Sequence, residues 1–425
     1  MDYGVIRGYS NGGTYTFKGV PYAQPPIDHL RWKKPLPLDP GNRFVSAKSY
    51  RDQCTQPAFN PILNIYSPVV LDLLGARGSE DCLNLNIWVP ARYKGEKLPV
   101  AFFIHGGGHF LGSNQDRLID GKKFAKKNNV IFVSINYRLG PLGFMAFKDL
   151  IPPNLGLYDI LLALKWVNEN IESFGGDDSR ITIMGESAGG ANVLALMASP
   201  LARGLFSAAI VQSGHDIYLP LEMAHKVSEV VIENLNCDKY RDDFECLNQR
   251  EASDIVEAIS TNKLGHEVIL GPVVDGEFLL QSITETFRLG RQNKVPVIVG
   301  TNADEMTTVM TTFYRDKIDN EDLYEKLLKD QFGDENLQAI NEAYPPNQYS
   351  DLKEGMQDIL GDFLFHGVAR SLLAALANTQ DEPVYRYVFS FKSNRPLLKH
   401  LVQGMPWSLF KFLKPTVRHA SIWFY

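Results

Sequence analysis

The sequence lacks several features that mark whole classes of protein. Its 43 Lys and Arg residues face 49 Asp and Glu residues, a net charge of −6 over 425 residues. A chain without a basic excess has no electrostatic footprint for nucleic acid. The longest apolar runs, such as 99–104 and 191–198, fall far short of the roughly 20 residues that span a bilayer. We therefore expect no nucleic-acid partner and no transmembrane segment, and Met1 is not followed by a signal peptide.

Cysteine and histidine are also sparse, at four and nine residues. No pair of them has the spacing of metal ligands next to a second pair, so we expect no metal site. Repeats, low-complexity tracts and linkers are missing as well. A chain that is 44% apolar can bury one large core at this length, so we predict a single domain over residues 1–425.

The most informative feature that is present is GESAGG at 185–190. It follows RITIM (180–184), which is typical of a buried strand, and precedes ANVLALMAS (191–199), which is typical of a helix. A strand, a tight turn and a helix with a serine at the apex form the strained turn that exposes a nucleophile at the end of a sheet. We therefore predict that Ser187 attacks a carbonyl carbon.

A second motif lies upstream, where an apolar run from residue 98 ends in His105 followed by three glycines. Glycines let backbone N–H groups approach a ligand closely, and hydrolases with the serine turn use such a loop to hold an oxyanion. We predict that Gly107, Gly108 and Ala188 donate these N–H groups. A plain glycine turn after a strand is the alternative.

The acid and the base of such a site follow the serine along the chain. The segment 295–306 is an apolar strand running into a polar turn, and it offers Asp304 and Glu305 as candidate acids.

Among the later histidines, His366 falls in a helical pattern and is interpreted as a helix-face residue. His400 and His419 remain as candidate bases, and both could also be polar loop residues.

The sequence resembles the type B carboxylesterase family, which also contains cholinesterases and neuroligins. The resemblance is carried by segments in the order of the family: FKGVPYAQPP (17–26) with LRW (30–32), SEDCLNLNIWVP (79–90), HGGG (105–108), NYRLGPLGFM (136–145), NLGLYDILLALKWVNENIESFGGD (154–177), GESAGG, VQSG (211–214) and GPVVDGEFL (271–279). The family acid is the Glu of a GxNxxE pattern, which here is Gly300, Asn302 and Glu305. The resemblance therefore favours Glu305 over Asp304.

For the base, TVRHASIWFY (416–425) resembles the histidine loop of the family around His419, and His400 lacks this context. The chain departs from the family pattern at Thr416, where a glycine is expected, and by having no acidic residue after Ser421. The resemblance implies a triad of Ser187, Glu305 and His419. Family members also extend further at both ends, which implies a truncated isoform or gene model, or a chain without the C-terminal helices.

The implied fold is an α/β-hydrolase, with a mostly parallel sheet covered by helices on both faces. Strands are predicted at 98–105, 130–136, 180–186, 208–212, 295–301 and 384–390, with a core helix within 149–174 and helical lid segments at 219–265 and 307–350. The implied activity is hydrolysis of uncharged carboxylic esters through an acyl-enzyme, without a cofactor. Alternatives are a catalytically impaired interaction protein, or a member recruited to lyase or acyl-transfer chemistry.

The four cysteines resemble disulfide positions of secreted family members, which implies the pairs Cys54–Cys82 and Cys237–Cys246. Disulfides favour a secretory origin. The absence of any Asn-x-Ser/Thr glycosylation site favours the cytoplasm instead.

Further residues are open to more than one interpretation. Glu186 either tunes the catalytic histidine or is a buried, hydrogen-bonded carboxylate. Ser213 either orients Glu305 or satisfies the backbone at a strand end. Glu80 and Asp81 are interpreted as ion-pair partners of Arg31 or another arginine. The tryptophan that binds choline in cholinesterases is replaced by Asp72, so a choline ester is not the expected substrate.

Overall fold

The computed structural model describes residues 4–41, 43–57, 76–91, 95–116, 119, 121–259, 270–307, 310, 318 and 320–391. The chain separates into two compact units. The first comprises residues 1–59, 68–299 and 372–385, and the second comprises residues 60–67, 300–371 and 386–425. The single domain over the whole chain stays a prediction.

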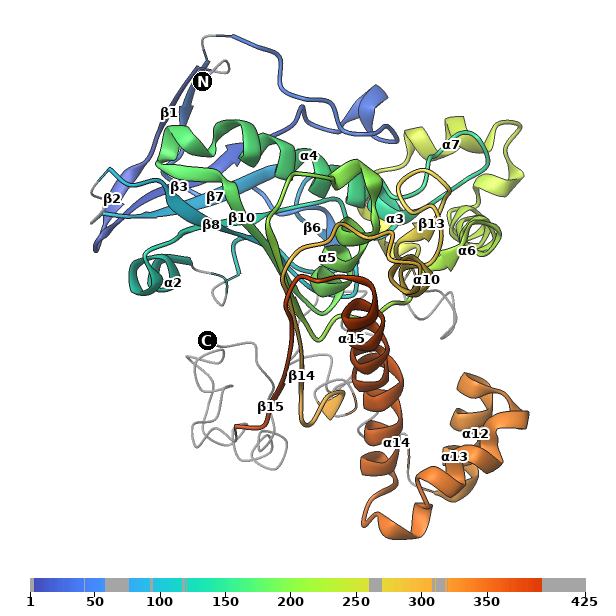
Figure 1. Ribbon diagram of the computed structural model, residues 1–425. Helices are drawn as coiled ribbons and strands as arrows, with labels where there is room; N and C mark the ends of the chain where they lie inside the picture. The colour runs from blue at the N-terminus through green and yellow to red at the C-terminus, as the bar shows by residue number, and fades with distance from the viewer. Residues whose placement is uncertain are drawn as a thin grey trace, which may run out of the picture. The chain divides into compact units, whose positions relative to one another are not determined.

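The main sheet has nine strands in the order β15-β14-β11-β10-β8-β9-β7-β3-β2 (Figure 1). Its middle strands β9, β8, β10 and β11 are parallel, whereas β2, β3 and β7 are antiparallel to their neighbours. The strands are β2 (Tyr9–Asn11), β3 (Thr14–Pro21), β7 (Asn84–Pro90), β8 (Leu98–Ile104), β9 (Ile131–Ile135), β10 (Gly176–Glu186), β11 (Ala208–Gln212), β14 (Val297–Asn302) and β15 (Val384–Phe389).

All six predicted strands are present. Strands β2, β3 and β7 were missed because polar residues interrupt them. In β7 every residue is buried, yet Asn84 and Asn86 break its apolar run. Shorter pairs join β1 (Gly4–Arg7) to β4 (Arg43–Ser46), β5 (Gln56–Pro57) to β6 (Ala76–Arg77) and β12 (Leu219–Pro220) to β13 (Val273–Val274).

Helices cover both faces of the sheet. Helix α2 (Gly121–Asn128) packs against β7 and β9, and α4 (Leu155–Asn170) packs against β10 on the other side (Figure 1). Helix α5 (Ala188–Ala198) packs against both β10 and β11. Helices α4 and α5 are apolar nearly all round, which is the pattern expected for helices buried on every side.

The segment after residue 219 is helical, as predicted. Helices α6 (Leu221–Asn234), α7 (Asp243–Gln249) and α8 (Ala252–Glu257) pack together with α3 (Gly140–Phe144) over a shared core. Val231, Leu247 and Ile255 are fully buried in that core. Helix α10 (Ile283–Arg288) follows and packs against α5.

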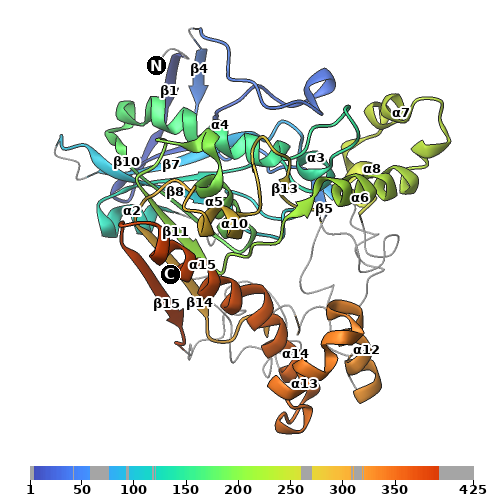
Figure 2. The ribbon, with the colours of Figure 1, turned by 45° about the vertical axis from the view of Figure 1, so that its right-hand side comes forward.

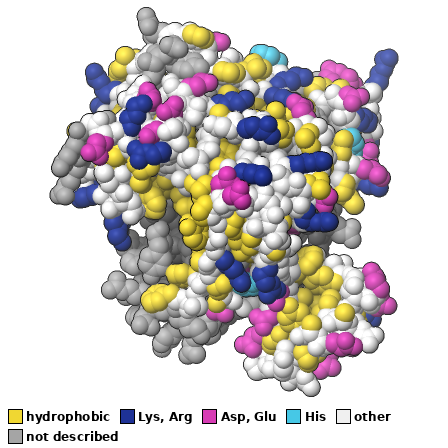
Figure 3. All heavy atoms as spheres, in the orientation of Figure 1, with side chains coloured by type: hydrophobic (Ala, Val, Ile, Leu, Met, Phe, Trp, Pro, Cys, Tyr) yellow, Lys and Arg dark blue, Asp and Glu magenta, His cyan; other side chains and the backbone are white. Residues whose placement is uncertain are grey.

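Helices α12 (Glu321–Phe332), α13 (Leu337–Ala343) and α14 (Leu352–Gly361) belong to the second unit and lie side by side in Figures 1 and 2. Tyr324, Leu328, Met356 and Ile359 form their core. Figure 3 shows hydrophobic side chains gathered over α12 and α13, with acidic side chains around them.

Helix α14 continues through a π-helical turn (Asp362–His366) into α15 (Gly367–Thr379). In the described part of the chain, this run (Leu352–Thr379) is the one helix whose length and composition would allow it to cross a membrane. Core helices of soluble proteins meet the same test, so the absence of a transmembrane segment stays a prediction.

Candidate active site

Ser187 stands at the apex of the predicted strand, turn and helix. Strand β10 ends at Glu186 and α5 begins at Ala188, and between them Ser187 has φ 56° and ψ −124°. A non-glycine residue in such a conformation costs about 1–3 kcal/mol and is held there by its surroundings. One such contact is the hydrogen bond from the Ser187 N–H to the Gln212 carbonyl, at 2.9 Å.

The two glycines that flank the serine are required by close backbone packing. A Cβ on Gly189 would lie 2.2 Å from the Ile104 carbonyl oxygen, and a Cβ on Gly185 would lie 2.3 Å from the Gly189 carbonyl oxygen. No side chain fits at those distances. The turn therefore has the geometry that the GxSxG pattern predicts.

The glycine loop and the serine turn meet at one edge of the sheet. Ile104, the last residue of β8, pairs with Gly185 in β10, so both strands end at the same level. A Cβ on Gly106 would lie 3.1 Å from the Ser187 Cβ. Gly107 and Gly108 have φ values of 113° and 62°, which L side chains rarely adopt.

Ala188, the third predicted donor, is the first residue of α5. The first N–H groups of a helix have no partner within the helix, so they are available to an anion. The loop and the helix start together place backbone donors beside the serine.

His105 begins the glycine loop as a buried, neutral ring. Burial lowers the pKa of His105 to about 4, and its hydrogen bond to the Gly106 carbonyl acts in the opposite direction. The ring stacks on Tyr137 with centroids 4.5 Å apart. The Tyr137 hydroxyl donates to the His105 carbonyl at 2.9 Å. His105 is thus a structural support of the loop.

His109 ends the loop, and sequence reasoning did not single it out. Its Nε2 is 3.0 Å from Oδ1 of Asn192, a residue of α5. Burial, and then the neighbouring His215, lower the pKa of His109 to about 3. Burial also lowers the pKa of His215 to about 4, although Asp216 acts against this.

Glu305, in the second unit, turns back onto the end of β14. Its carboxylate accepts the Asn302 backbone N–H at 2.8 Å and the Asn302 side-chain amide at 3.1 Å. Glu305 is buried, whereas Asp304 is only partly so. His366 bonds to the Thr301 hydroxyl at 3.0 Å, on the helix where it was expected.

Some predicted residues cannot be placed. His400, His419 and Asp72 lie outside the described residues. Among the residues that are described, no group of three or more His, Cys, Asp or Glu side chains could hold a metal ion.

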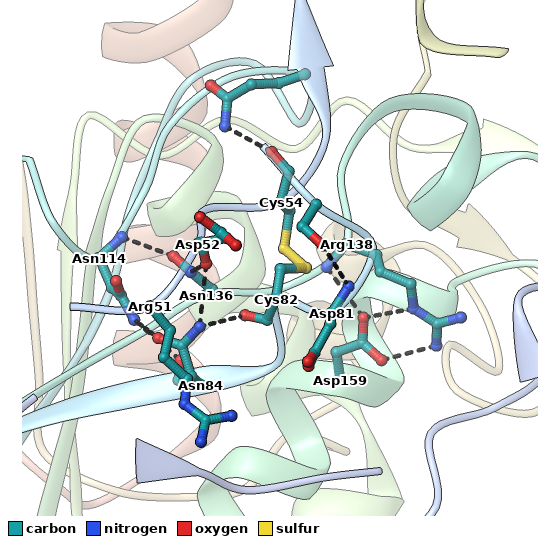
Figure 4. The surroundings of a disulfide bond; sticks show 12 residues. Arg51, Asp52, Cys54, Asp81, Cys82, Asn84, Asn114, Asn136, Arg138 and Asp159 are labelled. Carbon is teal, nitrogen blue, oxygen red and sulfur yellow. Dashed lines mark hydrogen bonds and ion pairs between the residues drawn. A yellow bond between two sulfur atoms is a disulfide. The ribbon is translucent and has the colours of Figure 1, made fainter. Parts of the chain in front are cut away.

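Both expected disulfides, Cys54–Cys82 and Cys237–Cys246, are formed. Figure 4 shows the first of them among polar side chains, with the buried ion pair of Arg138 and Asp159 beside it. Two residues beyond Cys54, the Gln56 amide accepts the Gly112 N–H at 3.0 Å and donates to the Gly112 carbonyl at 2.8 Å.

The disulfide segment therefore binds the backbone at Gly112, three residues beyond the end of the glycine loop. The expected arginine pair is also present, because Arg31 contacts both carboxylate oxygens of Glu80 at 2.7 and 2.8 Å.

A strained serine turn beside a glycine loop, at the end of a mostly parallel sheet covered by helices on both faces, defines the α/β-hydrolase class. Comparison with known proteins refines this class. A family model described as the carboxylesterase family matches residues 1–418. The para-nitrobenzyl esterase of Bacillus subtilis (strain 168) is 31% identical over 402 residues, which cover 93% of this chain and 78% of that protein.

The cholinesterase of Mus musculus is 37% identical over 341 residues, which cover 72% of this chain and about half (53%) of that protein. A crystal structure of a Geobacillus stearothermophilus carboxylesterase matches with a TM-score of 0.79 at 32% identity, over 92% of this chain and 79% of that chain. The chain belongs to the carboxylesterase family, and it is an enzyme that hydrolyses carboxylic esters.

Proposed function

We propose that this protein is a serine esterase that acts on uncharged carboxylic esters through an acyl-enzyme. The observation that carries the proposal is the strained Ser187 beside the glycine loop, because a nucleophile and oxyanion donors are useful to acyl transfer only when they adjoin. In this proposal Glu305 and His419 complete the triad, and Gly107, Gly108 and Ala188 donate to the oxyanion.

The reaction has two matched halves. His419 removes the hydroxyl proton of Ser187 as the oxygen attacks the ester carbonyl, and Glu305 orients the ring and stabilises its cation. The oxyanion collapses, the bond to the alkoxy group breaks, and His419 returns the proton to the departing alcohol. Water then attacks the acyl-enzyme with His419 again as the base, which releases the acid and restores Ser187.

A fluorophosphonate probe tests this directly. We expect it to label Ser187 alone, since only that serine is proposed to have both a base and an oxyanion site, and we expect Ser187→Ala to abolish both labelling and ester turnover. Peptide mass mapping locates the adduct. A folded protein with no adduct, or with the adduct on Ser213, would contradict the proposal.

The same experiment separates the competing functions. Partner binding without labelling or turnover would indicate an interaction protein. Labelling at Ser187 without turnover of any simple ester would indicate recruitment to another acyl-transfer or lyase reaction.

The proposed substrates are uncharged esters of short to medium chain length. An aromatic ring over a quaternary ammonium contributes up to about 2 kcal/mol of binding when desolvated. The position of the choline-binding tryptophan of cholinesterases is Asp72 in this chain, and no Trp occurs between Trp32 and Trp88. We therefore expect similar kcat/KM for acetylcholine and for its uncharged carbon isostere. A hundredfold preference for acetylcholine would contradict this substrate class.

A further inference from the structure

We propose that the hydrogen bond between His109 and Asn192 is a positioning element that holds the oxyanion donors in register with the nucleophile. This inference rests on the proposed function and concerns residues outside the proposed triad. It assigns a role to two side chains that are 83 positions apart and that join the end of the glycine loop to the nucleophile helix.

The glycine loop needs external support. Gly106, Gly107 and Gly108 are consecutive, and glycine loses more conformational freedom on folding than any other residue. An oxyanion site acts only if its donors are already aimed when the charge develops. Three successive glycines therefore have to be fixed by the residues on either side of them.

The structure provides a hydrogen bond at each end. At the start, the Tyr137 hydroxyl donates to the His105 carbonyl at 2.9 Å. At the finish, the His109 ring contacts Asn192 at 3.0 Å, and the His109 carbonyl accepts the Gly140 N–H at 2.7 Å.

The Asn192 end of the bond lies on the nucleophile helix. Asn192 is four residues after Ala188 in α5, so both residues lie on the same side of that helix. The bond thus links Gly108, which precedes His109, to the helix turn that carries the proposed third donor. Loop and helix can then shift relative to one another only by breaking a buried hydrogen bond.

The chemistry of the bond is well defined. His109 and Asn192 are both nearly inaccessible to solvent, at 3% and 0% exposure. Because Asn192 Oδ1 is an acceptor, His109 Nε2 carries a proton and donates it to the hydrogen bond. Burial, which lowers the pKa of His109 to about 3, keeps the ring neutral. The ring also packs on Phe144 with centroids 4.7 Å apart. His109 has φ 63°, a conformation in which His and Asn are more common than most side chains.

A double-mutant cycle tests the link. The variants are His109→Phe, Asn192→Ala and the pair together, with His109→Gln as the conservative change that keeps an amide donor. The control is His225→Gln on α6, which we expect to match wild type. The measurements are kcat and KM for an uncharged ester, the rate of phosphonylation at Ser187, and the thermal midpoint of unfolding.

We expect each single change to lower kcat and the phosphonylation rate roughly tenfold and to leave KM little changed. The reason is that misaimed oxyanion donors reduce the stabilisation of the transition state more than they reduce substrate binding. We expect the double variant to be no slower than the slower single variant, because residues that act through one shared contact are not additive. His109→Gln should retain more activity than His109→Phe.

Two results would overturn the proposal. One is unchanged kcat and phosphonylation in folded single variants, even with a lower thermal midpoint, which would make the bond purely structural. The other is a double variant whose loss of kcat equals the product of the two single losses, which would show that His109 and Asn192 act independently. If His109→Phe does not fold, the cycle is run with His109→Gln, Asn192→Ala and their double variant, which decide between the same outcomes.

The experiment also distinguishes this proposal from the proposed function. If wild type neither labels at Ser187 nor turns over esters, both fail. If wild type does so and the variants match it, only the positioning role fails.

Discussion

At the scale of single residues, the proposed site depends on backbone conformations that most side chains avoid. Ser187 follows strand β10, and Gly107, Gly108 and His109 follow strand β8. All four residues have positive φ. Such strain persists only when many contacts determine it. The strand pairing of Gly185 with Ile104 and the buried His109–Asn192 bond are contacts of this kind.

The glycines and the serine could be predicted from the sequence because their conformations are local properties of the chain. The partners of His109 could not. Asn192 lies within a helix that is apolar all round, and nothing in its neighbourhood indicates a histidine 83 positions away. The GxNxxE pattern indicated that Asn302 and Glu305 belong together, and two hydrogen bonds join them, whereas the role of Glu305 as the acid stays a prediction.

The proposed base is tested by comparing two histidines. We expect His419→Ala to abolish esterase activity and His400→Ala to leave most of it, because only His419 has the sequence context of the family loop. The measurement is kcat/KM for one chromogenic ester. The opposite result would assign the base to His400.

At the scale of secondary-structure elements, the missed strands β3 and β7 each place two Thr or Asn side chains in buried positions. Strand β3 contains the buried Thr14 and Thr16, whose hydroxyls lie 3.2 Å apart. These residues obscure the hydrophobic period that identifies a strand. The missed strands lie at the antiparallel end of the sheet, and the nucleophile follows the parallel strand β10.

The two disulfides close loops of different lengths, which gives a prediction about stability. The sequence separations are 28 for Cys54–Cys82 and 9 for Cys237–Cys246. In the chain-entropy relation, closing these loops stabilises the fold by about 3.6 and about 2.7 kcal/mol, respectively. We therefore expect Cys54→Ala/Cys82→Ala to lower the free energy of unfolding in urea by more than Cys237→Ala/Cys246→Ala does. Unchanged urea midpoints in both pairs would contradict this expectation.

The same pairs support our proposal that the protein resides in a secretory or other oxidising compartment. Protein isolated from its native cells, with thiols blocked during lysis, should contain no alkylated cysteine. Four alkylated cysteines would favour the cytoplasm.

At the scale of the whole molecule, the unusual electrostatics are in the interior. In the upper part of the face drawn in Figure 3, acidic and basic side chains are interspersed. Inside the first unit, His105, His109 and His215 are all held neutral by burial. Composition alone cannot show this, because it depends on which of the nine histidines the fold buries.

The lowered pKa values of these three histidines predict that the folded protein loses stability in mild acid. Their folded-state pKa values, about 4, 3 and 4, lie below the ordinary value of 6.5, so the unfolded chain binds more protons as pH falls below 6.5. Their stabilising contribution is complete above that pH and is lost as pH falls towards 4. Within that window, each of these histidines lowers the free energy of unfolding by up to about 1.4 kcal/mol per pH unit. Asp159, whose pKa is raised by burial although Arg138 acts against this, contributes in the opposite direction.

We therefore expect the urea midpoint of unfolding to fall steeply between pH 6.5 and pH 5. His215→Phe should make the fall shallower, because it removes one partly buried histidine of lowered pKa and keeps both partners of the His109–Asn192 bond. The control is His29→Gln, an exposed side chain that meets solvent in both the folded and the unfolded state, and it should keep the wild-type slope. A flat midpoint over this range, or a His215→Phe slope equal to that of wild type, would show that burial of these rings does not govern the acid response.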